Sequence, residues 1–170
     1  MPEINLLDLF QRLHRSGFRD LAGTRITAAV PISEALLNDL IAASLPANAP
    51  VRAVSIRPEA ANHFSARIVP KAALIPAITL KLAIDRQPQL PSSPVLVLRM
   101  VTLGGLFGLA SGAIAGLLPP GVTLEGEHIL VDLRTIAAQR GAVDPFQYLT
   151  GLRIETDAGK LVLHVDAGVG

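Results

Sequence analysis

The sequence predicts an α+β fold: a curved, mainly antiparallel sheet of about eight short strands with helices packed on one face. Two observations lead to this fold class. Short runs of alternating apolar and polar residues recur along the chain with turn residues between them, as in antiparallel hairpins. Helical spacing is confined to a few segments that do not alternate regularly with these runs. The 170 residues, half of them hydrophobic, suffice for a single domain with a sizeable core.

Residues 1–20 are expected to form an N-terminal amphipathic helix ahead of an α+β body at 21–170. This helix docks on the body or lies on a membrane surface, and both alternatives stay open. Charged residues interrupt its apolar run, so no export signal is expected, and the predicted location is the cytoplasm, with or without membrane association. The residues of the apolar stripe are Ile4, Leu6, Leu7, Leu9, Phe10 and Leu13.

The first elements of the body are a short strand at 25–31 and a helix at 34–45. Ser33 is the expected N-cap, and Glu34 lies in the first turn, where a negative charge favours the helix. Pro46 ends the helix, because proline cannot continue it.

A strand-rich region follows the helix. Residues 51–57 and 62–69 predict a hairpin. After the proline-rich loop at 87–94, residues 95–102 are apolar on both sides, which predicts a strand covered on both faces. The strand at 77–86 alternates most cleanly, and its apolar side consists of Ile78, Leu80, Leu82 and Ile84.

The C-terminal region contains the remaining strands and two short helical segments. Residues 121–133 predict one strand or a hairpin. A short helix is expected to begin at Asp132 or Leu133, and a further helical turn is expected at 145–149. The closing hairpin consists of the strands 152–157 and 160–166.

Residues 103–118 are the most unusual segment, because glycine recurs at every fourth position and no charged residue occurs from 100 to 124. On a helix these glycines form a smooth ridge that another backbone can approach closely. Three interpretations stay open: a transmembrane helix, a buried helix laid against the sheet, and a helix that lines an apolar cavity or a self-association surface. The sixteen residues span only about 24 Å as a helix, less than a hydrocarbon core of about 30 Å, which disfavours the transmembrane interpretation.

Charge and aromatic content bear on the partners. The net charge is +1, and there are five phenylalanines, one tyrosine and no tryptophan, so nucleic acid is not an expected partner. Charge is unevenly distributed, with a balance of +5 over residues 52–99 and −3 over residues 100–170. The basic region faces an anionic surface or forms ordinary solvated strand faces.

No catalytic or metal-binding constellation is apparent in the sequence. Cysteine is absent, and His14, His63, His128 and His164 are dispersed without a metal-ligand spacing. Ser111 lies among glycines but lacks the spacing of a nucleophile elbow. Neither an enzymatic activity nor a cofactor is therefore expected, and an enzyme whose site is assembled from distant residues is the third alternative.

The order of the elements, with a Leu37-Asn38 pair on the first helix of the body, resembles that of tubular lipid-binding (TULIP-like) proteins over residues 25–167. The resemblance implies a highly curved sheet wrapped around a helix, with an apolar groove for acyl chains. It implies no catalytic residues. The segments that carry the resemblance are 31–41, 118–122, 129–133 and 159–163.

The predicted function is non-enzymatic binding of a lipid or another apolar small molecule in a groove between the curved sheet and helix 103–118. The alternative is an oligomeric structural or interaction protein that self-associates through the glycine ridge or an edge strand. Peripheral membrane contact and homo-oligomerisation are the further partner expectations. The residues expected to line the groove are Leu80, Leu82, Leu96, Leu98, Leu106, Phe107 and Ile114.

Overall fold

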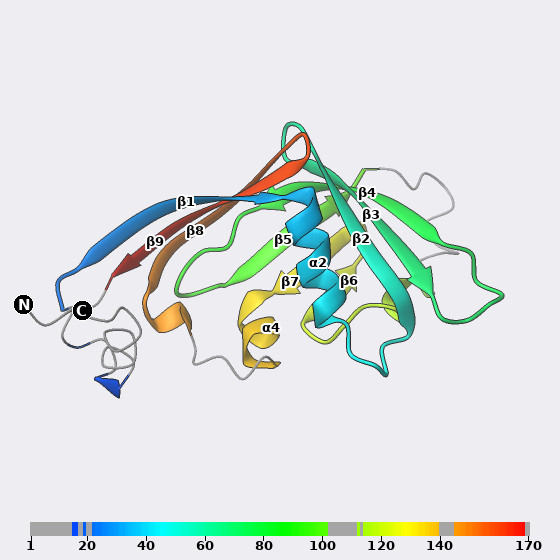
Figure 1. Ribbon diagram of the computed structural model, residues 1–170, viewed down its shortest axis with the longest axis horizontal. Coiled ribbons are helices and arrows are strands. Elements are labelled where there is room, and N and C mark those ends of the chain that lie inside the picture. Colours follow the sequence, from blue (N-terminus) through cyan, green and yellow to red (C-terminus); the bar gives the residue numbers. More distant parts are fainter. Residues whose placement is uncertain are drawn as a thin grey trace, which may run out of the picture.

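The computed structural model describes residues 15–16, 19, 22–101, 112, 114–139 and 145–168, which form an α+β fold with two antiparallel sheets (Figure 1). The three-stranded sheet has the order β1–β9–β8, with β1 at Arg25–Ser33, β9 at Lys160–Gly168 and β8 at Leu149–Asp157. The six-stranded sheet has the order β2–β3–β4–β5–β7–β6. Its strands are β2 (Val51–Glu59), β3 (His63–Pro70), β4 (Ile78–Arg86), β5 (Val95–Met100), β7 (His128–Asp132) and β6 (Val122–Glu125). The helical elements are α2 (Glu34–Ser44), α4 (Leu133–Gln139) and the 3-10 turn η2 (Pro145–Gln147).

The expected α+β class is confirmed, but the expected single sheet is divided into two sheets where β3 meets β8. Ala61 and Asn62 have φ angles of 58° and 61°, so the chain leaves the extended conformation just before β3 begins. The Asn62 side chain then accepts a hydrogen bond from the Thr156 N–H at 3.1 Å, and the Thr156 hydroxyl donates to the His63 carbonyl at 2.8 Å. The Asn62 N–H also donates to the Thr156 carbonyl at 3.4 Å. A few backbone bonds and side-chain bonds thus join the two sheets here, in place of a continuous ladder.

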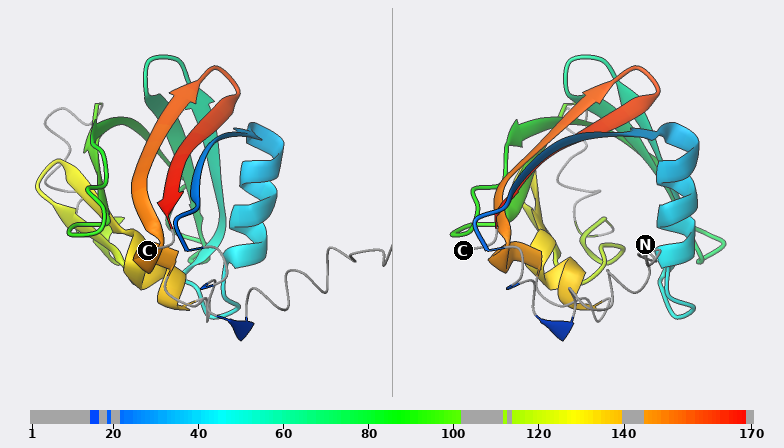
Figure 2. Two further views of the ribbon diagram at one scale, coloured as in Figure 1. Left: turned by 90° about the vertical axis from the view of Figure 1, so that its left-hand side faces the viewer. Right: turned by 60° about the vertical axis from the view of Figure 1, so that its left-hand side comes forward.

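Both sheets curve around a common concave side, and Figure 2 shows them as an arch with α2 along one flank and α4 at its foot. Helix α2 packs mainly against β2, which is an edge strand of the six-stranded sheet. None of the residues of α2 is buried, and Leu36 and Leu40 are half exposed. The helix therefore covers the flank of the arch, and its apolar stripe is not sealed in the core.

Several local predictions are confirmed. The Ser33 hydroxyl caps α2 by accepting a hydrogen bond from the Leu36 N–H at 3.2 Å. On β5 the side chain of Val97 is buried on the face opposite Leu96 and Leu98, so this strand is covered on both faces. Residues 121–133 contain the hairpin of β6 and β7, in which Gly126 has a φ angle of 58° that favours glycine.

One hydrophobic core joins the two sheets. Ile154 of the three-stranded sheet packs in the same cluster as Leu80 and Leu82 of β4. Ile114 belongs to this cluster and is fully buried, and Figure 2 shows residues 114–118 inside the arch. The core therefore lies on the concave side of the two sheets. The buried members of the cluster are Ala49, Val51, Phe64, Ala66, Ile68, Leu80, Leu82, Leu96, Leu98, Met100, Ile114, Ile129 and Ile154.

Two predicted helices fall largely outside the described residues. Only residues 15–16 and 19 of the N-terminal segment are described. Within the glycine-spaced segment, Gly112, Ile114 and Ala115 are helical, while residues 103–111 are outside the described part. Among the helices of the described residues, none is long and apolar enough to cross a membrane.

Candidate functional site

The residues predicted to line an apolar groove come together on the concave side. Leu80 and Leu82 on β4, Leu96 and Leu98 on β5, and Ile114 belong to one core cluster. They are buried among one another, so they form the packed floor of the concave side. Leu106 and Phe107 lie outside the described residues.

The apolar face of the three-stranded sheet extends from the core to β1, where its side chains are exposed to solvent. Ile154 of β8 pairs with Leu163 of β9, which pairs with Val30 of β1, so the three side chains share one face. Leu163 packs against the core, which identifies this face as the concave one. Exposure rises along this row, from 8% at Ile154 to 45% at Val30, and Ile26 on the same side of β1 is 54% exposed.

We call the partly exposed, core-side face of β1 and β9 the apolar shelf. Because Val30 and Ile26 are on the core side of β1, their exposure is not that of an ordinary solvated strand face. The alternation of β1 did not reveal the shelf, because the sequence indicates which residues share a face but not whether another element covers it. The residues of the shelf are Ile26, Ala28, Val30, Leu163 and Val165.

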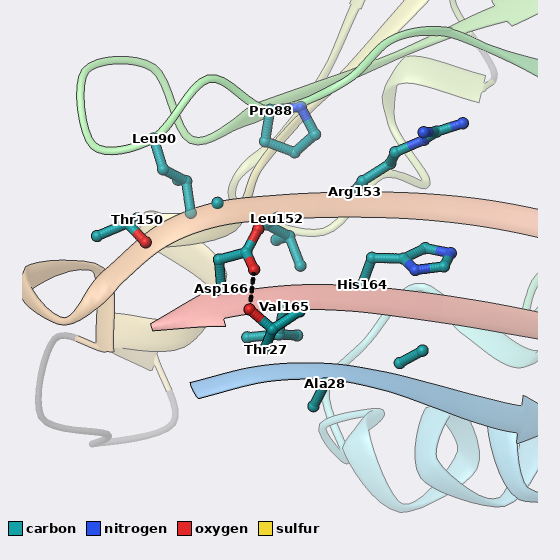
Figure 3. Close-up of a pocket in the computed structure, with 12 residues that line it drawn as sticks. Thr27, Ala28, Pro88, Leu90, Thr150, Leu152, Arg153, His164, Val165 and Asp166 are labelled. Carbon is teal, nitrogen blue, oxygen red and sulfur yellow. Dashed lines mark hydrogen bonds between the residues drawn. The ribbon is translucent and has the colours of Figure 1, made fainter. Parts of the chain in front are cut away.

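Thr27, Asp166, Arg153 and His164 lie on the opposite face of the same sheet, where they line a pocket of about 490 Å³ together with apolar residues (Figure 3). The Thr27 hydroxyl donates a hydrogen bond of 2.7 Å to Asp166 at its centre. Asp166 leans over Gly151, where an added Cβ would lie 2.8 Å from the carboxylate oxygen Oδ2. A glycine on β8 thus makes room for a carboxylate on β9. The residues that line the pocket are Thr27, Ala28, Ala29, Pro88, Leu90, Thr150, Gly151, Leu152, Arg153, His164, Val165 and Asp166.

Two bases extend the polar face along the sheet. His164 Nε2 lies 2.9 Å from Glu155 Oε2, and Arg153 forms an ion pair with the same carboxylate. The His164–Glu155 contact joins β9 to β8, whereas Arg153 and Glu155 are two positions apart on β8. All three groups are partly exposed, so these contacts contribute little to stability. In Figure 3 the side chains of Arg153 and His164 extend along the sheet away from Asp166, so the acids and bases do not converge on one point. The arrangement suits polar contacts and lacks the geometry of a nucleophile with an oriented base.

A loop borders this pocket because one side-chain amide attaches it to β8. The Gln87 side chain donates to the Ile154 carbonyl at 2.7 Å and accepts from the Ile154 N–H at 2.9 Å. It therefore pairs with the edge of β8 as a strand would, and it places Pro88 and Leu90 over the pocket. The role of Gln87 is not visible in the sequence, since nothing in the local pattern indicates a partner 67 positions away.

A second outer pocket, of about 400 Å³, lies over β4, β5 and β7. Asp85 is 3.7 Å from Arg99 Nε and 3.6 Å from His128 Nε2, and Glu125 also lines the pocket. These side chains are more than one-third exposed, so their ion pairs contribute little to stability. Within the described ranges, no group of three or more histidines and carboxylates is arranged to hold a metal ion.

No protein-family model, curated protein or solved structure matches this chain. A functional proposal therefore depends on the apolar and charged surfaces of the structure itself.

Proposed function

We propose that the protein binds a lipid or another apolar small molecule on the concave side of its sheets, without catalysing a reaction. The observation that carries the proposal is the apolar shelf, which continues the surface of the core and is left open to solvent at Val30 and Ile26. The five described residues of the predicted groove form the floor beside it. The resemblance to tubular lipid-binding proteins supports the same ligand class, because it implies an acyl groove inside a curved sheet.

The ligand lies on the concave side of the sheets and extends over the apolar shelf. Apolar burial drives binding, and each methylene group contributes about 0.8 kcal/mol, which is about a fourfold change in affinity. A series of fatty acids of increasing chain length tests this directly. We expect the dissociation constant to fall by about fourfold for each added methylene until the chain outgrows the site.

Two neighbouring positions on β1 provide a matched pair of variants. Val30→Glu places a charge on the shelf, whereas Ala29→Glu places the same charge on the opposite face of the same strand. We expect Val30→Glu to weaken fatty-acid binding at least tenfold, because a carboxylate in apolar surroundings is costly. Ala29→Glu is expected to bind as the unmodified protein does. Equal effects of the two variants, or an affinity that does not depend on chain length, would contradict the proposal.

A second candidate function is self-association through β1. This strand is an edge of the three-stranded sheet, is nine residues long, and exposes apolar side chains next to its free edge. Pro31 has no N–H, so it can occupy a position whose N–H would point to the unpaired edge of β1. The backbone groups of residues two positions apart in a strand point to the same side, so the N–H of Ala29 also points to the unpaired edge. Ala29→Pro therefore removes a donor from the free edge without breaking the pairing with β9. Light scattering that shows a dimer for the unmodified protein and a monomer for Ala29→Pro would favour this candidate over lipid binding.

A further inference from the structure

The connection between β3 and β4 carries an exposed apolar tip. All seven residues from 71 to 77 are exposed, and the sequence of this loop is apolar except for Lys71. Leu74 is 98% exposed, and Ile75 beside it is 40% exposed. The Ile75 N–H donates to the Ala72 carbonyl at 3.1 Å, which closes a turn around the tip. Because Leu74 and Ile75 are adjacent within a run of exposed apolar residues at 72–77, they form a contiguous apolar tip of the kind that marks an interaction site.

The base of this loop is firmly held. The backbone N–H of Lys71 donates to the Pro50 carbonyl at 2.9 Å, and its ammonium group donates to the Ala47 carbonyl at 2.6 Å. The ladder of β3 and β4 begins directly behind the loop, where Ile68 pairs with Ile78. The structure therefore presents Leu74 on a fixed support at one end of the six-stranded sheet, where Figure 1 shows the loop projecting beyond the strands.

Positive charge surrounds this end of the sheet. Residues 51–81 contain five bases and one acid, a balance of +4 in a chain whose total is +1. Arg52 and Lys71 are next in the chain to Val51 and Pro70, the pair at this end of β2 and β3. Arg67 is exposed and pairs with Thr79, next to the Ile68–Ile78 pair at the start of the β3–β4 ladder. The single acid, Glu59, pairs with His63 at the opposite end of β3 and accepts a hydrogen bond from Ser65. Arg57 and Lys81 both pair with Ser65 and also lie toward that end, so Arg52, Arg67 and Lys71 are the bases near the loop. The region next to the loop is therefore basic and has no nearby acid on these two strands.

We propose that this end of the six-stranded sheet docks on an anionic lipid bilayer. Leu74 and Ile75 insert among the acyl chains, while Arg52, Arg67 and Lys71 face the phosphate groups. An exposed apolar tip with bases behind it matches the two layers of such a surface, since apolar side chains enter the interface by about 5–10 Å and basic side chains stay at the headgroups. Nucleic acid matches the charge but offers no apolar layer for Leu74. This inference does not depend on the ligand proposed for the concave side.

Sedimentation with vesicles tests the charge requirement. We expect binding to vesicles of phosphatidylcholine that contain phosphatidylglycerol, little binding to phosphatidylcholine alone, and loss of binding as the salt concentration rises. Arg67→Gln is expected to weaken binding about fivefold, since each base near an anionic surface contributes about that factor. Arg25→Gln removes an exposed base from β1 and serves as the matched control that leaves binding unchanged. Equal binding to neutral and anionic vesicles would overturn the proposal.

Fluorescence tests insertion of the tip, because the chain contains no tryptophan. Leu74→Trp introduces a single indole at the tip, and Leu40→Trp introduces one at a half-exposed leucine of α2. We expect a blue shift on addition of anionic vesicles for Leu74→Trp only. In parallel, Leu74→Ser is expected to reduce vesicle binding about tenfold, while Leu40→Ser leaves it unchanged.

The Val30→Glu variant separates this proposal from lipid binding on the concave side. It is expected to retain full vesicle binding, because the apolar shelf and the loop are on different sheets. Loss of vesicle binding in Val30→Glu, or a Leu74→Trp emission that does not shift when the protein sediments with vesicles, would refute docking through residues 71–77.

Discussion

One asparagine of helix α2 forms two hydrogen bonds with the six-stranded sheet. The Asn38 side chain donates to the Ile56 carbonyl at 2.9 Å and accepts from the Ile56 N–H at 2.7 Å, so it pairs with the outer edge of β2. Both bonds are partly buried, and no residue of α2 is buried. Each bond contributes about 1 kcal/mol to the free energy of unfolding, so Asn38→Ala is expected to cost about 2 kcal/mol. For a chain of this size that corresponds to a fall in Tm of about 4–8 °C.

Asp39→Ala is the matched control for this prediction, because Asp39 is the exposed neighbour on the same helix. Thermal unfolding followed by circular dichroism measures the difference in Tm, and hydrogen exchange at the Ile56 amide reports the bond itself. Asn38→Asp sharpens the test. At neutral pH the carboxylate cannot donate to the Ile56 carbonyl, so this variant has a lower Tm than the unmodified protein. Protonation of the carboxylate restores a donor, so the difference in Tm is expected to shrink in acid. The reasoning is wrong if Asn38→Ala and Asp39→Ala unfold together and exchange at Ile56 is unchanged.

Two further predictions concern single side chains. Asp132 caps α4, and hydrogen bonds first from the Thr135 hydroxyl and then from the Thr135 N–H hold the pKa of this carboxyl below its usual value. Because the folded-state pKa is lowered, the stabilisation is complete above about pH 4 and is lost as the pH falls through the folded pKa. Asp132→Ala should therefore cost about 1 kcal/mol at neutral pH in urea unfolding, with a gap that closes in acid. Gly151→Ala is expected to displace the Asp166 carboxylate and cost about 1 kcal/mol. In an Asp166→Ala background most of this cost should be absent, because only the Cβ of residue 166 remains, at 3.3 Å from the added Cβ.

The sequence predicted the elements whose cause is local. The alternation of β4 identified Leu80 and Leu82 as one side of a strand, and both side chains are buried while Thr79 and Lys81 are exposed. Helix α2 begins where Ser33 caps it. A cap, a turn or a period of two residues is decided within a few positions of the chain, which is why such features are readable without the fold.

The division into two sheets was not predictable in this way. It depends on Asn62 and Thr156, which are 94 positions apart, and the loop over the polar pocket depends on Gln87 and Ile154. Side-chain amides pair with backbone groups wherever folding brings them together, so the sequence around an asparagine or glutamine does not identify its partner. The same limit applied to the functional surfaces. The pattern showed which residues of β1 share a face, but the exposure of Val30 results from how the whole chain is arranged.

The edge strands of the two sheets differ in how they are protected, and β1 is the least protected of them. An open strand edge invites unwanted pairing, and proteins commonly protect it. In the described part of the chain, Asn38 pairs with the outer edge of β2, Gln87 pairs with β8, and β6 is only four residues long. On β1, by contrast, nine residues form an edge whose concave side is apolar and is exposed at Ile26 and Val30, with Pro31 as the residue that lacks a donor. Since the other edges are protected in the described part of the chain, the open edge of β1 there fits the proposed ligand or second copy as its cover. Val30→Glu and Ala29→Pro separate these two occupants, because the first alters the apolar face of β1 and the second alters only its backbone edge.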